Sequence, residues 1–427
     1  MTQSRTAVER AALIARRDVV VDLARAACIL LVVVAHLLMI GVWFDDSGAI
    51  VLSRPAEAQP WFAAATWAGQ VMPLFFALGG FTAITAWRSL QKRGGDSADF
   101  VRARVLRLAT PALPLFIGFA LGLGTARLAG ADPELLDAIA KGAGSPLWFL
   151  GAFLLVQCLV PITARLHRRA PVLTLAGLAG TAALIDAARI ASGVETLGHV
   201  NIIFIWAFVQ QLGFWMADGW FKRRTAPQLT GLAAVSYLTI WLLVERGWYS
   251  PDMLTNLNPP TGPLGLLGIA QVSILTLLYA PLNALMRLRA VRATVSLVGS
   301  RSMTIYLWHL PIIIGVAALM LLAPWAMPEP ATAAWWWSRA LILVVVLGLV
   351  WLVSIPLARF EALPTAIPEG YRRPAPGATY TAAALAFIPP FLVIEFFLDL
   401  RIAVVGVVLL GTAFLLVRPR RVRASAA

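Results

Sequence analysis

The chain has 427 residues, of which 60% are hydrophobic and only 13% are charged, and its mean hydropathy is +0.80. Soluble domains carry about 25% charged residues, so this composition excludes an ordinary soluble protein and predicts a polytopic membrane protein. The net charge of +14 would suggest nucleic acid in a soluble chain. Here the basic residues alternate between loops, so we attribute them to membrane topology and expect no nucleic-acid partner.

The predicted fold is an all-α, polytopic transmembrane helical bundle of about twelve spans. No small-residue cleavage site follows the basic N-terminus at signal-peptide distance, so we expect the first apolar run to be retained. Cys28 and Cys158 both fall within apolar runs and predict no disulfide framework and no metal site. With spans of about 20 residues, the predicted segments are 19–42, 62–87, 107–128, 147–164, 171–190, 200–220, 228–246, 263–286, 297–322, 335–357, 379–398 and 401–417.

Basic residues fall on one side of this arrangement, in the N-terminus, in the tail and in alternate loops, whereas the other side is rich in Asp and Glu. The positive-inside rule then places both termini in the cytoplasm of a multi-pass cell-membrane protein. We divide the chain into a membrane core, 1–360, with about ten spans. The remainder, 361–427, comprises a cytoplasmic connector, a transmembrane hairpin and a basic tail.

The first apolar run contains ionisable residues, which are costly at membrane depth and indicate a functional site. Arg25 and His36 are eleven positions apart, or roughly three helical turns, so they share one helix face about 16 Å apart. Asp22 precedes Arg25 by three residues and can pair with it. If Arg25 lies near one membrane face, His36 lies near the middle of a hydrocarbon core of about 30 Å.

In the second predicted span, the pair Gly79-Gly80 permits either a close helix approach or a local break. Before the third span, Arg104 and Arg107 lie three residues apart and are expected to share a helix face at the cytoplasmic boundary. Such a pair suits a polyphosphate, because guanidinium groups bind phosphate in a fork geometry. The alternative is that these arginines only anchor the topology.

Further polar residues lie in later spans. Ser302, Tyr306 and His309 follow the spacing of one helix face, which predicts either a site or a hydrogen-bonded packing seam. Asp186 and Arg189 end the fifth span and are candidates for an ion pair. Gln210, Gln211 and Asp218 in the sixth span either line a cavity or bond between helices.

Together these stretches resemble the acyltransferase type 3 family of polytopic membrane acyltransferases. The resemblance runs in order from about residue 18 to 360 and rests on five sequence motifs: Asp22-x-x-Arg25 with ten residues before His36; Phe75-Phe76 with Gly80-Phe81; Phe100-x3-Arg104-x2-Arg107; Leu147-Trp148-Phe149-Leu150; and Ser302-x3-Tyr306-Leu307-Trp308-His309-x-Pro311. The arginine–ten–histidine pattern and the Tyr-Leu-Trp-His stretch are its most specific parts.

The resemblance implies transfer of an acyl group, often acetyl, from cytoplasmic acyl-CoA to a hydroxyl of a sugar, glycolipid or secondary metabolite. Acyl transfer to a hydroxyl needs a base with a pKa near neutral, which suits His36, although His36 as a transient acyl carrier stays open. Arg25 would either orient the thioester or stabilise developing negative charge, and His309 would support catalysis.

In the same scheme Arg104 and Arg107 would hold the CoA phosphates. Asp22, Ser302, Tyr306 and Trp308 would support the site. Acyl-CoA would be a substrate, so we expect no permanently bound cofactor and no metal, and lipid would be the remaining partner. A twelve-span secondary transporter is the alternative, but it usually shows repeat symmetry, which the sequence lacks.

Overall fold

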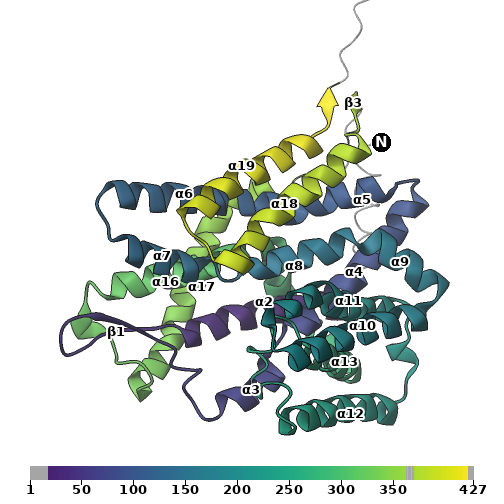
Figure 1. Cartoon of the computed structure of the whole chain (residues 1–427), viewed down its shortest axis with the longest axis horizontal. Helices are drawn as coiled ribbons and strands as arrows, with labels where there is room; N and C mark the ends of the chain where they lie inside the picture. Colours follow the sequence, from purple (N-terminus) through teal and green to yellow (C-terminus); the bar gives the residue numbers. More distant parts are fainter. Residues whose placement is uncertain (1–17, 362, 364–366, 368–369, 422–427) are drawn as a thin grey trace, which may run out of the picture.

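The structure is a computed structural model, which describes residues 18–361, 363, 367 and 370–421. Most of these residues lie in helices that run along one common direction (Figure 1). The helices are α2 (Val19–Met39), α3 (Phe62–Gly69), α4 (Met72–Lys92), α5 (Ser97–Arg104), α6 (Leu113–Leu128), α7 (Pro133–Gly144), α8 (Leu147–Cys158), α9 (Val160–Arg169), α10 (Pro171–Ser192), α11 (Asn201–Ala217), α12 (Ala226–Glu245), α13 (Gly262–Leu277), α14 (Tyr279–Leu285), α15 (Arg289–Ser300), α16 (Ser302–Met320), α17 (Ala333–Glu361), α18 (Pro376–Phe396) and α19 (Leu400–Val417).

Strands are few and short within the described residues. β1 (Gly41–Phe44) pairs antiparallel with β2 (Ile50–Ser53), and β3 (Tyr371–Arg372) pairs with β4 (Arg420–Arg421). Ten helical segments of the described chain are long and apolar enough to cross a membrane. Two pairs of helices bent at a short break, α7 with α8 and α13 with α14, bring the number to twelve if each pair is one span. Every predicted span has a helical counterpart, so the predicted all-α membrane bundle is confirmed.

The third span differs from its prediction because its helix begins at Ser97 and runs to Leu128, whereas 107 was expected as the start. Asp96 and Asp99 form a reciprocal capping box that starts the helix early. A π-helical turn, Val105–Ala109, then separates Arg104 from Arg107. The wider turn changes the angle between successive residues, so Arg104 is partly buried and Arg107 is exposed. The two arginines therefore differ in exposure, and their expected shared helix face stays a prediction.

Three other predicted spans are shorter or bent. The first helix ends at Met39, and the following residues form β1 because the side chain of Asp45 accepts hydrogen bonds from the Ser47 and Ala49 amides in a tight turn. The predicted span 263–286 is bent by 62° between α13 and α14. The predicted span 147–164 is likewise divided at Leu159, where α8 gives way to α9.

Helices α4 and α11 cross at very close range near the centre of the bundle. A methyl group on Gly80 would collide with the carbonyl oxygen of Gln210, and one on Gly213 would collide with the α4 backbone, 2.5 Å from the Phe81 nitrogen. Helix α4 is continuous through Gly79-Gly80, so the glycine pair serves close approach and not a break. The side-chain amides of Gln210 and Gln211 donate to the Val156 and Thr163 carbonyls, which makes them interhelical bonds.

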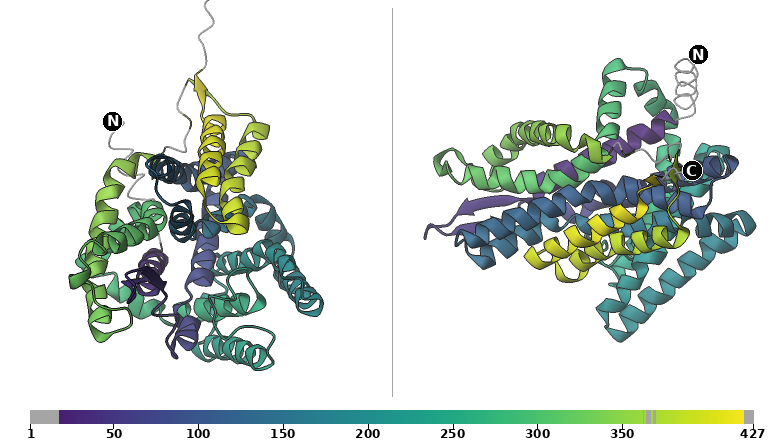
Figure 2. Two further views of the ribbon diagram at one scale, coloured as in Figure 1. Left: turned by 60° about the vertical axis from the view of Figure 1, so that its left-hand side comes forward. Right: turned by 90° about the horizontal axis from the view of Figure 1, so that it is seen from above.

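The C-terminal hairpin packs against the rest of the bundle. Figure 2 shows α18 and α19 lying against α6 and α8, on the side of α2 opposite to α15, α16 and α17. Residues of both hairpin helices belong to the largest apolar cluster, together with residues of α6 and α8. Arg102, which is buried, donates from Nε to the Val417 carbonyl at 2.8 Å and so attaches the end of α19 to α5.

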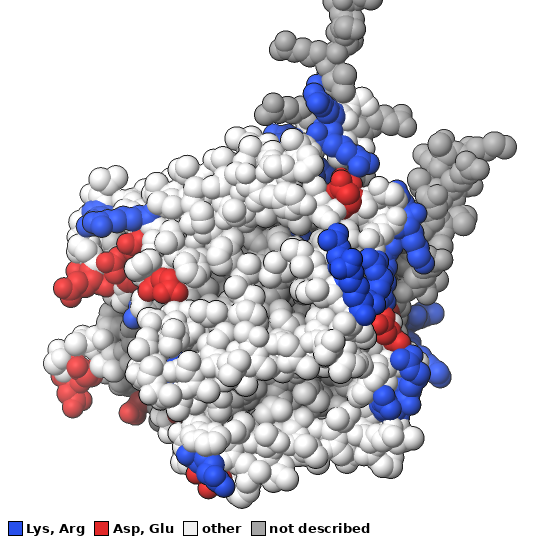
Figure 3. Space-filling model, turned by 45° about the vertical axis from the view of Figure 1, so that its right-hand side comes forward, with Lys and Arg blue, Asp and Glu red and all other residues white. Residues whose placement is uncertain are grey.

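Charge is distributed unevenly along the common helix direction. Figure 3 shows Lys and Arg gathered mainly toward one end of the molecule, and Asp and Glu frequent at the other. At the basic end, Arg88 of α4 and His167 of α9 bind the two oxygens of Asp218, at 2.7 and 2.9 Å. Burial opposes ionisation of Asp218, but these hydrogen bonds outweigh it and hold the pKa of its carboxyl below the usual value.

We expect Gly213→Ala to destabilise the protein strongly, because its methyl group has no room against the α4 backbone. Overpacking of this kind costs typically about 1–3 kcal/mol. Gly177→Ala in α10 is the matched control, because a methyl group there meets no atom within 4 Å. The thermal unfolding midpoint of both purified variants in detergent is the measurement. Equal midpoints would show that the close α4–α11 crossing is not required.

Candidate active site

The N-terminal end of α2 is held in place by Asp18. Its carboxylate accepts hydrogen bonds from the Val20 and Val21 amides and so caps the helix. The other carboxylate oxygen contacts Lys222 Nζ at 3.2 Å and the Tyr279 hydroxyl at 3.1 Å. These contacts tie α2 to the end of α11 and to the α13–α14 bend, which orients the helix that carries Arg25 and His36.

His36 and His309 meet between α2 and α16. His36 Nδ1 lies 3.2 Å from His309 Nε2, and the ring centroids are 5.0 Å apart. His309 is fully buried, whereas His36 retains partial exposure. The sequence singled out both residues but contained no signal that they touch, since 273 positions separate them.

The hydrogen-bond partners assign the tautomer of each ring. His309 Nδ1 lies 2.7 Å from the Tyr306 carbonyl, and His36 Nδ1 lies 2.8 Å from the Val32 carbonyl. A carbonyl only accepts, so each Nδ1 carries the hydrogen, and each neutral ring keeps its lone pair on Nε2. His309 Nε2 can then accept from His36 Nδ1–H. This arrangement leaves His36 Nε2 unprotonated, as a base must be.

An aromatic wall connects Arg25 with the two histidines. The Arg25 guanidinium lies 5.9 Å from the Phe75 ring, which packs edge-on against Phe149 at 5.3 Å. Phe149 contacts Tyr306 at 4.9 Å, and Tyr306 in turn lies 6.2 Å from His309. The Tyr306 hydroxyl donates to the Pro146 carbonyl, which fixes α16 against the start of α8.

Two further arginines lie on the same side of the molecule as Arg25. The Arg104 guanidinium stacks on the Phe100 ring at 4.4 Å. Arg25 and Arg107 are both close enough to Arg104 for their charges to act on it. Three guanidinium groups from α2, α5 and the π-helical turn are therefore gathered in one region, which favours a ligand with several negative charges.

The structure places His36 near one end of its helix, and its depth in a membrane stays a prediction. Helix α2 ends at Met39, so His36 lies within the last turn of the helix, about 26 Å from its start. The C-terminal end of α2 is therefore only about one turn from His36. Arg25, by contrast, lies about three turns away on the same helix.

The remaining predicted site residues lie around this centre without joining it. Asp22 lies on α2, three residues before Arg25. Ser302 is the first residue of α16 and is partly exposed. Trp308 is half-buried and packs with the largest apolar cluster, near Gly118 of α6.

Glu361 is a residue that the sequence analysis missed. It ends α17, and its Oε1 accepts a hydrogen bond from the Thr304 amide at 2.6 Å. Helix α16 has no side-chain cap from its own sequence, so Glu361 satisfies a free amide in its first turn. The sequence feature that could have pointed to Glu361 is its position, because it is an acidic residue at the end of a span on the arginine-rich side.

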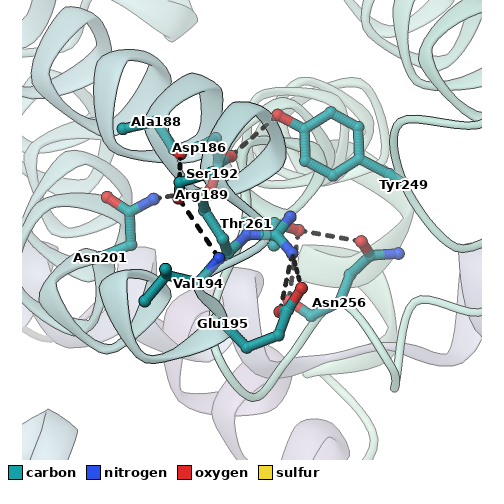
Figure 4. A network of polar contacts seen from close by, with 10 residues as sticks. All are labelled: Asp186, Ala188, Arg189, Ser192, Val194, Glu195, Asn201, Tyr249, Asn256 and Thr261. Carbon is teal, nitrogen blue, oxygen red and sulfur yellow. Dashed lines mark hydrogen bonds and ion pairs between the residues drawn. The ribbon is translucent and has the colours of Figure 1, made fainter.

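The polar residues at the C-terminal end of α10 and the N-terminal end of α11 form a separate hydrogen-bonded network (Figure 4). Asp186 accepts hydrogen bonds from Asn201 Nδ2 at 2.9 Å, the Tyr249 hydroxyl at 2.9 Å and the Gly262 amide at 2.8 Å. Arg189 pairs with Glu195 at 2.9 Å, so the expected Asp186–Arg189 pair is wrong. Burial and the Asp186 carboxylate raise the pKa of Tyr249, which keeps it a donor. This network attaches a loop to the bundle.

We expect Glu361→Ala to destabilise the protein by about 1 kcal/mol, as loss of a helix cap does. Glu361→Gln keeps an oxygen that can accept from the Thr304 amide, and should lie close to the wild type. Glu245→Ala, at the exposed end of α12, is the matched control. The thermal unfolding midpoints of the purified variants measure these stabilities. An equal loss of stability in the Gln and Ala variants would show that the capping bond is not the cause.

A family model described as an acyltransferase domain matches residues 18–355. Neither the curated proteins nor the solved structures contain a match to the chain. The matched segment holds Arg25, His36, Arg104 and His309, and it supports a transferase over the alternative of a transporter. The chain belongs to the acyltransferase type 3 family and is a helical, multi-pass membrane protein with an acyltransferase domain.

Proposed function

We propose that this protein transfers an acyl group, most often acetyl, from cytoplasmic acyl-CoA to a hydroxyl of a sugar, glycolipid or secondary metabolite. The observation that carries the proposal is the His36–His309 contact. It leaves the partly exposed His36 with an unprotonated Nε2 inside a domain whose family performs acyl transfer. The uneven charge distribution supports a cell-membrane protein with its basic end, and both termini, in the cytoplasm.

In the proposed reaction, His36 Nε2 removes the proton of the acceptor hydroxyl as its oxygen attacks the thioester carbonyl. The carbon–sulfur bond then breaks, the acyl group stays on the acceptor oxygen, and the CoA sulfur leaves with the proton that His36 received. His309 Nε2 accepts a hydrogen bond from His36 Nδ1–H and stabilises the imidazolium that forms in between. This is the role of the third group that orients a catalytic base.

On the donor side, Arg25, Arg104 and Arg107 bind the CoA phosphates and direct the thioester along α2 toward His36. The separation of about three turns between Arg25 and His36 favours donor binding over charge stabilisation at the reacting carbonyl. The wall formed by Phe75, Phe149 and Tyr306 excludes water along this path. The acceptor approaches His36 from the nearer end of α2.

We expect His36→Ala to lower release of CoA from acetyl-CoA by about 10²- to 10⁴-fold, because the general base is lost. His309→Ala should cost less, about 10- to 100-fold, because it removes the partner and not the base. His199→Ala, at a distant site beside Glu395, is the matched control. Turnover by the purified protein, at equal folded amounts, is the measurement. Wild-type turnover in His36→Ala would remove His36 from the mechanism, and a greater loss in His309→Ala would exchange the two roles.

For the donor site, we expect the double variant Arg104→Ala/Arg107→Ala to raise the apparent KM for acetyl-CoA and to leave that for the acceptor nearly unchanged. A charge-assisted contact is worth about 1.5–3 kcal/mol, so each arginine can contribute roughly 10- to 150-fold. Arg104→Lys should lose more than Arg107→Lys, because Arg104 is partly buried and stacks on Phe100. Arg168→Ala, exposed at the same end, controls for membrane insertion. Unchanged donor affinity in the correctly inserted double variant would refute phosphate binding.

A further inference from the structure

A small pocket lies where the ends of α2, α16 and α17 meet, away from Asp18. Helices α2 and α16 are the helices that carry the two histidines, and α17 packs against both. The walls of the pocket are apolar except for one guanidinium group. The principal lining residues are Ile40, Val42, Ala317, Met320, Trp335 and Arg339.

The pocket continues the histidine site along the same helices. Ile40 comes directly after the last residue of α2 and lies four positions beyond His36, a rise of about 6 Å. Met320 follows His309 by three turns on the same face of α16. The pocket therefore lies beyond the two histidines, about one turn from His36 along α2 and about three turns from His309 along α16, on the side from which the proposed acceptor approaches.

Arg339 is the polar group of the pocket. Its guanidinium stacks on the buried Trp335 at 4.3 Å, and its Nη2 donates to the Ser338 hydroxyl at 3.1 Å. The described residues provide no carboxylate partner within ion-pair distance, and Glu329 in the adjoining loop is exposed. An arginine within a membrane-spanning helix is costly to keep and indicates a functional role.

We propose that Arg339 binds an anionic oxygen group, a carboxylate or a phosphate, on the acceptor and thereby presents the acceptor hydroxyl to His36. This inference rests on the proposed acyl transfer and specifies its substrate class. Guanidinium recognises both anions through paired hydrogen bonds, which an ammonium group does not reproduce. The ring of Trp335 keeps the guanidinium oriented beneath the apolar wall. A lipid headgroup is a second source of the same phosphate chemistry.

The test uses the purified full chain, acetyl-CoA and three matched probes: glycerol, glycerol 3-phosphate and glycerate. Each probe carries hydroxyls on the same three-carbon chain, and only the last two are anionic. A bound probe either raises CoA release by accepting the acetyl group or lowers basal hydrolysis by occupying the site. The concentration that gives half of the effect therefore measures binding in both cases.

For the wild type, we expect the half-effect concentrations of the two anions to lie about tenfold or more below that of glycerol. Arg339→Gln should abolish this preference, and Arg339→Lys should restore only part of it. Arg127→Gln, exposed at the end of α6, is the matched control and should behave as the wild type. A repeat in nanodiscs of phosphatidylcholine or phosphatidylglycerol separates the two sources. Loss of the glycerol 3-phosphate effect only in phosphatidylglycerol assigns the anion to a lipid headgroup.

Equal half-effect concentrations for all three probes, no response to the anions, or a preference that survives Arg339→Gln would each overturn the inference. An Arg339→Gln variant that is merely less stable, with its anion preference intact, would make Arg339 an interfacial anchor. His36-dependent CoA release without any anion preference would refute only the role of Arg339. No His36-dependent CoA release at all would refute the proposed function itself.

Discussion

The contact between His36 and His309 is the interaction on which the proposed chemistry depends. It requires two helices to stay in register to within a few tenths of an ångström, because a hydrogen bond between rings weakens steeply with distance and angle. Asp18 fixes the start of α2, and Glu361 caps the start of α16. The Tyr306 hydroxyl holds α16 against α8. The Glu361 and Tyr306 bonds each join elements that are far apart in the sequence, so the site is a property of the assembled bundle.

The tautomer of each ring follows from backbone carbonyls of its own helix. The Val32 carbonyl accepts a hydrogen bond from His36 Nδ1–H, and the Tyr306 carbonyl accepts one from His309 Nδ1–H. Helical geometry thus places the lone pair of His36 on Nε2 and that of His309 toward His36. In the proposed chemistry, this pair of neutral histidines supplies a base and its supporting acceptor without a buried carboxylate, which would be costly in an apolar bundle.

Close packing elsewhere keeps this arrangement rigid. Gly80 and Gly213 let α4 and α11 touch along their backbones, and α4 carries Phe75 of the aromatic wall. The C-terminal hairpin, which lies beyond the matched family segment, covers α6 and α8 and is attached to α5 through Arg102. Small residues at helix crossings and hydrogen bonds between helices are the usual sources of stability where water is absent.

The amino-acid sequence by itself determined the class of fold, the number of apolar spans, the family, and Arg25, His36 and His309 as candidates. These follow from local quantities, namely the length of apolar runs, the sign of loop charges and the spacing of polar residues. Only the tertiary structure decided which residues meet. The His36–His309 contact, the Glu361 cap and the position of Arg339 beside the α2–α16 pocket each join helices that are distant in sequence. The π-helical turn between Arg104 and Arg107 could not be predicted from the sequence either, because packing against neighbouring helices, and not residue spacing, sets the local helix pitch.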